Sequence, residues 1–241
     1  MPDAAGASVD SDSIGGPSRN LFDLGRIGWS PRSPSAASDT ATPGSAPAEL
    51  VARPPRRPLP RVVERTLLFD VETKRSAEEV GGWLHVHRLG VALAVACFME
   101  ENRFRVYRED DVGALVDDLR GADLVVGFNS VRFDYRVLSG YTGEDFSRSL
   151  PTLDLLEEIE ASIGGRVGLS ALCEATLGAA KSSDGMQSLA WYREGRFDEI
   201  EQYCRRDVEL LRDLYLFGRR EGFVCYRDGE DRVLQIPVRW P

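Results

Sequence analysis

The sequence predicts an α/β fold in which helices flank a mixed sheet. Three strand-like segments come first, between residues 66 and 107, and their succession predicts an antiparallel meander. Helical and strand-like segments then alternate up to residue 153, which is typical of parallel strands. The segments that follow, up to residue 219, carry helical periodicity. We therefore expect an antiparallel three-strand meander extended by parallel strands.

Composition limits the classes of function. The chain has 241 residues, 42% of them hydrophobic, and a net charge of −9, which argues against a protein that coats duplexes non-specifically. It shows neither a signal peptide nor an apolar run of transmembrane length, so we expect a cytoplasmic protein. The four cysteines are scattered without a Cys-x-x-Cys pair, which favours reduced buried thiols over a zinc site.

Residues 1–60 are rich in Ser, Ala, Gly and Pro and show no sustained periodicity. We expect a disordered tail, followed by a folded domain over residues 61–222 and a closing hairpin over residues 223–241. One apolar island, residues 21–29, is either a docking peptide or a remnant without a partner.

The first strand is predicted over residues 66–73, where an apolar run is bounded by charged residues. Side chains alternate between the faces of a strand, so Asp70 and Glu72 share one face. A buried carboxylate is costly without a cation or another partner. The alternative is a strand end that emerges into water.

Two more strands and a helix follow. Residues 89–99 form a nearly continuous apolar run, which predicts a central strand, and residues 103–107 alternate as a half-exposed strand does. Val112, Leu115, Val116 and Leu119 recur at helical spacing, and Gly121 ends that helix. His85 and His87, before the second strand, are expected at a strand edge.

A second acidic segment joins the predicted strand over residues 123–128 to a helix that begins near Arg132. It contains Asn129 and Asp134, and such strand-to-helix junctions commonly hold ligands in α/β sheets. Asp134 is alternatively a helix-start residue that interacts with the helix dipole.

The third acidic position lies in the longest predicted helix, residues 197–219. A short strand over residues 150–153 and helices over residues 154–163, 169–177 and 186–194 precede it. Asp207 completes the apolar stripe of this helix, and Tyr203 lies one turn earlier on the same face. A buried arginine partner for Asp207 is the alternative.

Carboxylates that converge from strands and helices suit hard cations such as Mg²⁺ or Mn²⁺ rather than zinc. Two such ions about 4 Å apart stabilise both the attacking and the leaving oxygen of a phosphodiester displacement. Four basic residues flank the acidic segments and are candidates for phosphate contacts or for solvated surface: Lys74, Arg75, Arg132 and Arg136.

Three blocks of the sequence resemble the exonuclease motifs of the DEDD superfamily, in the variant that has tyrosine in the third motif. They are FDVET (residues 69–73), Asn129 with Phe133-Asp134, and Tyr203 with Asp207. Residues 169–181 and 191–214, which include YCRRDVELL, look like the ribonuclease H-like exonuclease domains found beside bacterial helicases. The resemblance covers residues 65–222 and implies a ribonuclease H-like fold.

The resemblance also implies roles for individual residues. Asp70 would bridge two metal ions, Glu72 and Asp207 would complete the first metal site, and Asp134 would help to hold the second. Tyr203 would orient or deprotonate the attacking water, and Asn129 would shape the substrate pocket.

The function implied is a metal-dependent 3′→5′ exonuclease acting on the 3′ end of DNA or RNA, with a helicase as a candidate partner. Two alternatives are open: a structure-specific endonuclease of the same fold, and an inactive nucleic-acid-binding or helicase-docking module.

Overall fold

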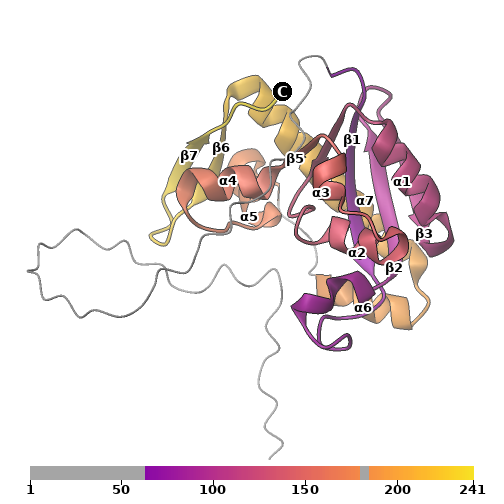
Figure 1. Cartoon of the computed structure of the whole chain (residues 1–241). Helices are drawn as coiled ribbons and strands as arrows, with labels where there is room; N and C mark the ends of the chain where they lie inside the picture. Colours follow the sequence, from indigo (N-terminus) through magenta and orange to yellow (C-terminus); the bar gives the residue numbers. More distant parts are fainter. Residues whose placement is uncertain (1–62, 180–184) are drawn as a thin grey trace, which may run out of the picture.

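A computed structural model describes residues 63–179 and 185–241 (Figure 1). The predictions for the tail, residues 1–60, and for the island at residues 21–29 lie outside the described residues.

Five strands form one mixed sheet in the order β3-β2-β1-β4-β5. The first three strands pair antiparallel, and β4 and β5 add to the other side of β1 in parallel. The predicted meander, extended by parallel strands, is thereby confirmed. The strands are β1 (Thr66–Thr73), β2 (Val91–Phe98), β3 (Arg103–Arg108), β4 (Leu124–Gly127) and β5 (Thr152–Asp154).

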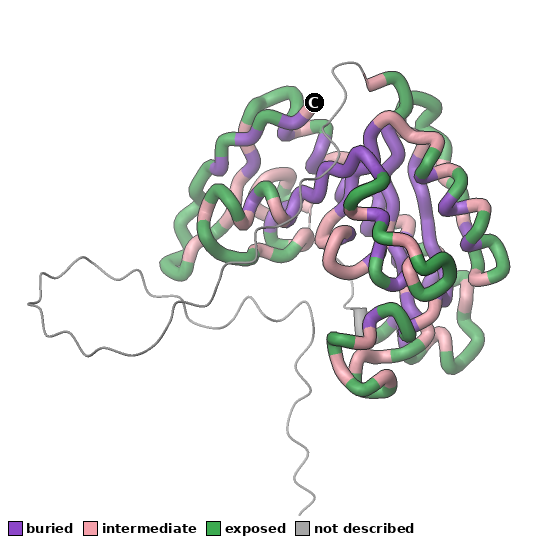
Figure 2. The backbone as a smooth tube through the Cα atoms, viewed as in Figure 1, coloured by how far each residue is buried: buried purple, intermediate pink, exposed green. Residues whose placement is uncertain are grey.

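Helices cover both faces of this sheet, so the fold has three layers (Figures 1 and 2). One apolar core lies between the sheet and α4, α5 and α7, and a second lies between the sheet and α1 and α2. The helices are α1 (Val112–Gly121), α2 (Asp134–Thr142), α3 (Phe146–Ser149), α4 (Leu155–Ile163), α5 (Leu169–Leu177), α6 (Gly185–Arg193) and α7 (Phe197–Glu221).

The central strand β1 divides its side chains between these two cores. Phe69 and Val71 are buried on the face of α1 and α2, whereas Leu68 is buried on the face of α7. Because side chains alternate along a strand, Asp70 and Glu72 follow Leu68 toward α7. The shared face predicted for the two acids is confirmed.

The short elements differ most from prediction. Two 3₁₀ turns, η2 (Trp83–Arg88) and η3 (Glu109–Asp111), and the four-residue α3 were not expected, since a helical period cannot be recognised over so few residues. His85 and His87 lie within η2, so their placement at a strand edge is wrong.

The hairpin expected at the C-terminus is present as β6 (Phe223–Arg227) and β7 (Val233–Pro237). It is tied to α5 because the Cys225 N–H donates to Thr176 Oγ1 (2.9 Å) and this hydroxyl donates to the Cys225 carbonyl (3.1 Å). Beyond the hairpin, Trp240 stacks on Tyr215 of α7 with ring centroids 6.1 Å apart. The hairpin and the segment after it therefore share the core on the α7 side of the sheet.

The close approach of Trp240 to α7 requires a glycine at position 218, because a Cβ there would overlap the indole ring. We expect Gly218→Ala to lower the free energy of unfolding by about 1–3 kcal/mol through overpacking. Gly113→Ala is the matched control, since Gly113 lies in α1 with open space around it and alanine favours helix there by about 0.5–1 kcal/mol. Urea unfolding measures both; equal stability of the two variants would contradict the packing argument.

In the part of the chain that the structure describes, no helix combines the length and apolar character needed to cross a membrane. All four cysteines lie in this part as free thiols, and three of them are buried, as their spacing suggested.

Candidate functional site

The candidate site lies at the C-terminal end of β1, at the bottom of Figure 1, where α2, α6 and α7 meet this strand. Parallel pairing with β4 involves only Thr66, Leu67 and Leu68. The second half of β1 therefore extends beyond β4, with backbone groups on that side open to other partners. Asp70 and Glu72 lie on this extension and are both half-buried.

Asp134 supplies one of those partners. It is the first residue of α2, and its Oδ1 accepts a hydrogen bond from the Val71 N–H of β1 (3.0 Å). The side chain is buried, and both burial and the nearby charge of Asp70 raise its pKa well above the usual value for a carboxyl. This hydrogen bond to β1 brings Asp134 next to Asp70. An aspartate that only interacted with the helix dipole would need no such contact.

Asp70 and Glu72 converge with a third side chain, Cys204 of α7. Oxygen atoms of the two carboxylates and the sulfur of Cys204 all lie within 4.8 Å of one another. Cys204 Sγ lies 3.5 Å from Asp70 Oδ2 and 3.4 Å from the Asp70 carbonyl oxygen, with the geometry of a thiol donor. This cluster fixes the position of α7 against the end of β1.

Tyr203 and Asp207 are on the same buried face of α7, one turn apart, as the periodicity of the sequence predicts. Each is only 6% exposed. The Tyr203 ring meets the Trp191 ring of α6 edge to face, with centroids 6.1 Å apart. Helix α6 thus contacts the tyrosine ring.

Asn129 opens the loop between β4 and α2 and has a left-handed backbone, with a φ of 64°. A non-glycine residue holds this conformation only when its surroundings compensate for the strain. Here its N–H donates to Asp154 Oδ1 (2.8 Å), and its side-chain oxygen accepts from Arg166 (3.1 Å). The residue predicted to shape a substrate pocket is therefore held at its backbone by Asp154 and at its side chain by Arg166.

Asp154 was not assigned a role from the sequence, yet it organises this loop. Its carboxylate accepts hydrogen bonds from the N–H of Asn129 and also from the N–H groups of Val131 (3.0 Å) and Leu156 (3.1 Å). The side chain is buried, and burial raises its pKa although the backbone donors oppose the shift. One carboxylate thus joins β5 and α4 to the loop that leads into Asp134.

The donor set fits a hard divalent cation. Carboxylate oxygens predominate, and a cation between Asp70 and Asp134 would relieve the repulsion that raises the pKa of Asp134. The one soft donor is Cys204. Burial and the charges of Asp70, Glu72 and Asp207 raise the pKa of its thiol well above its usual value, so without a metal ion Cys204 is a neutral neighbour of the two carboxylates.

Two residues of the site, Cys204 and Asp154, escaped sequence reasoning for different reasons. Cys204 lies next to Tyr203 in the apolar stripe of its helix, which indicated burial but not contact with Asp70, 134 residues away. Asp154 falls within the predicted helix over residues 154–163, whereas α4 begins at Leu155 and Asp154 is its N-cap. The cap is present at Leu156, but the contacts with the distant loop required the parallel pairing of β4 and β5.

No protein-family model matches this chain, and neither does any curated protein. Among solved structures, it is similar to the family B DNA polymerase from the hyperthermophilic archaeon Pyrobaculum calidifontis, with a TM-score of 0.50 and 17% sequence identity. The likeness covers 65% of this chain and 24% of the polymerase chain, so it spans about a quarter of that protein's length. At this identity it shows the fold alone: a mixed α/β sheet flanked by helices, consistent with the ribonuclease H-like fold that the sequence motifs imply.

Proposed function

We propose that this protein is a metal-dependent 3′→5′ exonuclease that hydrolyses phosphodiester bonds at nucleic-acid 3′ ends. The observation that carries the proposal is the cluster at the end of β1. There the carboxylates of Asp70 and Glu72 converge within 4.8 Å, and the buried Asp134 is hydrogen-bonded to the intervening Val71. The similar solved structure is that of a DNA polymerase, which supports a nucleic-acid substrate.

In this proposal four carboxylates, among them Asp70, would hold two Mg²⁺ or Mn²⁺ ions. The remaining three are Glu72, Asp134 and Asp207. When bound, the ions supply Lewis-acid stabilisation of the attacking and leaving oxygens. The chain's own contribution is to fix the acids on β1, α2 and α7, elements that are packed together through Val71 and Cys204.

Tyr203 is proposed to orient the attacking water and to accept or relay its proton. It lies one turn from Asp207 on α7, and its ring packs edge to face on Trp191. Asn129, held by Arg166 and Asp154, is proposed to contact the terminal nucleotide.

Both alternatives remain distinguishable by experiment. An inactive nucleic-acid-binding module would bind without cleaving, and an endonuclease would cut internally. The presence of an acid at each of the three motifs, together with Tyr203, supports an enzyme. The 3′→5′ polarity and a helicase partner rest on the sequence resemblance.

The test is digestion of end-labelled single- and double-stranded DNA and RNA with Mg²⁺, Mn²⁺ or a chelator. Stepwise shortening from the 3′ end that requires the metal supports the proposal. Internal cuts would support the endonuclease, and retained binding without cleavage would support the inactive module.

We also propose that residues 61–222 form the nuclease domain and that residues 223–241 extend it. The support is the shared core, in which Val224, Ile236 and Trp240 pack with residues of α5 and α7.

Asp154 allows a test of how the loop before Asp134 is positioned. In Asp154→Asn the amide retains one acceptor but places an N–H group where the Val131 N–H now donates, so the loop must shift. A misplacement of about 1 Å can cost on the order of 100-fold in rate, and we expect turnover to fall by about 10- to 100-fold.

The matched control is Asp123→Asn, because Asp123 also accepts two backbone N–H groups, from Glu64 and Arg65, but at the opposite end of β1. We expect its turnover to equal that of the wild type. Single-turnover cleavage measures both variants; equal losses would mean that Asp154 contributes only to general stability.

A further inference from the structure

The four basic residues that flank the acidic motifs fall into two kinds. Lys74 is ion-paired with Glu109, and Arg132 is ion-paired with Glu157 and Glu160. These two side chains are neutralised by carboxylates and are not available to a phosphate without first leaving them.

Arg75 and Arg136 instead point to the η2 turn. Arg75 Nη1 donates to the carbonyl of Arg88 (2.7 Å), and Arg136 Nη2 donates to the carbonyl of Leu84 (3.3 Å). A carbonyl orients a guanidinium group but does not neutralise it. Within the described residues, no carboxylate oxygen lies within 4.0 Å of Arg75, Arg136 or Arg88, and all three are exposed. In a chain of net charge −9, three arginines without a direct ion pair therefore gather at this turn. An electrostatic partner of Arg75 among the acids is shared: Glu109 is hydrogen-bonded to Lys74, and the charge of Arg75 also helps to lower the pKa of Glu109.

The same turn exposes two large apolar side chains. Trp83 is 47% exposed and Leu84 is 81% exposed. They do not belong to a loose segment, because Val86 and Leu89 are buried beneath them. In addition, Gly140 of α2 lies directly against the backbone of His87, where a Cβ would overlap the carbonyl oxygen. Exposed apolar groups on an anchored backbone indicate a contact surface.

A hollow of about 550 Å³ adjoins this surface, with His87 and Arg136 in its wall. Val131 and Tyr135 also line it, together with Glu144 and Asp145, which are ion-paired with Arg120 and Arg148. Among the described residues, Arg136 is therefore the unpaired charge in this wall that is available to a phosphate.

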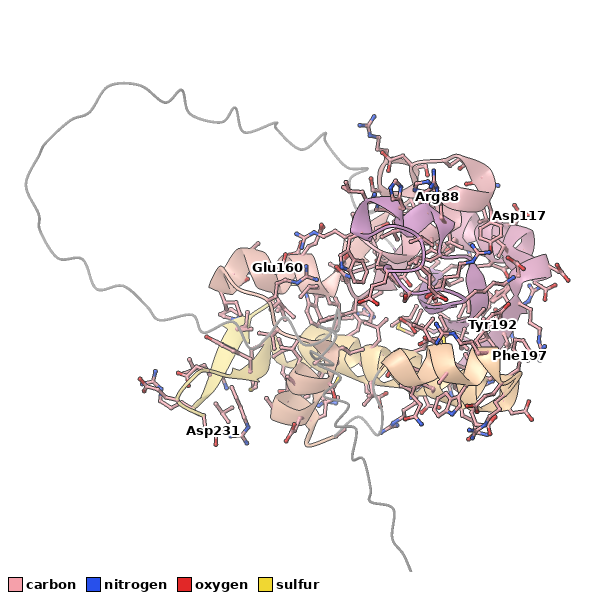
Figure 3. All side chains as sticks on the ribbon, turned by 90° about the horizontal axis from the view of Figure 1, so that it is seen from below. Arg88, Asp117, Glu160, Tyr192, Phe197 and Asp231 are labelled. Atoms are coloured by element: carbon pink, nitrogen blue, oxygen red, sulfur yellow. The ribbon has the colours of Figure 1, made fainter. Side chains whose placement is uncertain are left out.

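The surface is continuous with the candidate site. Strand β1 carries Glu72 and ends at Thr73, two residues before Arg75. In the loop that follows, Glu79 is ion-paired with Arg193 of α6 (3.1 Å). Helix α6 carries Trp191, which packs on Tyr203. In Figure 3, which looks up at this end of the sheet, Arg88 lies across from Tyr192 of α6.

We infer that the η2 turn binds single-stranded nucleic acid, with Trp83 as a stacking platform for an unpaired base and with the three arginines on its phosphates. Arginine binds phosphate oxygens by paired hydrogen bonds, and an exposed indole can stack on any base that is not already stacked on its neighbours. A base-paired duplex offers no such free base, so the surface selects single strands. This inference rests on the proposed function for the identity of the ligand as nucleic acid.

Binding of a fluorescent oligothymidylate in a chelator tests it without cleavage. We expect Trp83→Ala to weaken binding by about 5- to 100-fold, the usual value of one base–aromatic stack, and Trp83→Phe to restore most of it. Arg88→Gln should lower the slope of log K against log salt by about 0.7, as for one phosphate contact on a single strand. Arg239→Gln is the matched control, since Arg239 is exposed near the C-terminus and the change removes the same charge.

The outcomes separate this inference from the proposed function. If the wild type cleaves 3′ ends while Trp83→Ala and Arg88→Gln bind as the wild type does, the η2 surface is overturned and the nuclease stands. If binding depends on Trp83 but no metal supports cleavage, the surface stands and the nuclease fails. Absence of any oligonucleotide binding by the folded wild type would overturn the surface and favour a protein partner for Trp83 and Leu84.

Discussion

Asp70→Ala is expected to cleave an end-labelled oligonucleotide at least about a thousandfold more slowly than the wild type. Metal ions contribute several kcal/mol to such reactions, and each 1.36 kcal/mol is a factor of ten in rate. Asp70 lies next to two of the other acids: it converges with Glu72 and Cys204, and together with burial its charge raises the pKa of Asp134. Single-turnover cleavage with Mn²⁺ measures the loss.

The same variant tests the metal independently of activity. A cation that binds only the folded state raises the melting temperature by mass action, so Mg²⁺ or Mn²⁺ should stabilise the wild type. Asp70→Ala should lose most of this rise. Asp117→Ala is the control, because it removes an exposed carboxylate of α1, on the other face of the sheet, and should keep the rise (Figure 3). A wild-type melting curve that millimolar Mn²⁺ leaves unchanged would argue strongly against a metal site.

Tyr203→Phe is expected to lower turnover by about 10²- to 10⁴-fold, the usual contribution of a positioned acid–base group. Phenylalanine retains the ring that packs on Trp191 and removes only the hydroxyl, so the fold should persist. Because Tyr203 is not among the proposed metal ligands, the metal-induced rise in melting temperature should remain. Single-turnover rates and melting curves of the same preparation measure the two effects.

Two further variants serve as comparisons for Tyr203→Phe. Asp207→Ala should lose both turnover and the metal-induced rise, since its carboxylate is a proposed ligand one turn away on α7. Tyr226→Phe makes the same chemical change in the C-terminal hairpin and should alter neither. If Tyr203→Phe cleaves at the wild-type rate, the tyrosine is a packing residue and the assignment to the tyrosine-containing class is wrong.

The sequence alone predicted the elements that have a clear period. The alternation of β1 placed Asp70 and Glu72 on one face, and the helical stripe of α7 placed Tyr203 and Asp207 on another. These patterns are local: they follow from the two-residue repeat of a strand and the 3.6-residue repeat of a helix. They were enough to predict the mixed sheet, its antiparallel first part and the candidate acids.

Only the tertiary structure decided which of these side chains meet. It brought Cys204 to Asp70 across 134 positions of sequence, and Asp154 to the N–H groups of Asn129 and Val131. Sequence periodicity indicates the face on which a residue lies but not the register between elements, which depends on packing over the whole core.

The same limit applies to the basic residues beside the acidic motifs. In the sequence Lys74 and Arg75 are adjacent and equally suited to a phosphate, yet Lys74 is paired with Glu109 of η3 whereas Arg75 is turned to the backbone of η2. Whether a charge is paired depends on how close other segments place an opposite charge, because exposed charges more than about 8 Å apart are largely screened at physiological salt. That distance is a property of the folded chain, and composition and spacing do not contain it.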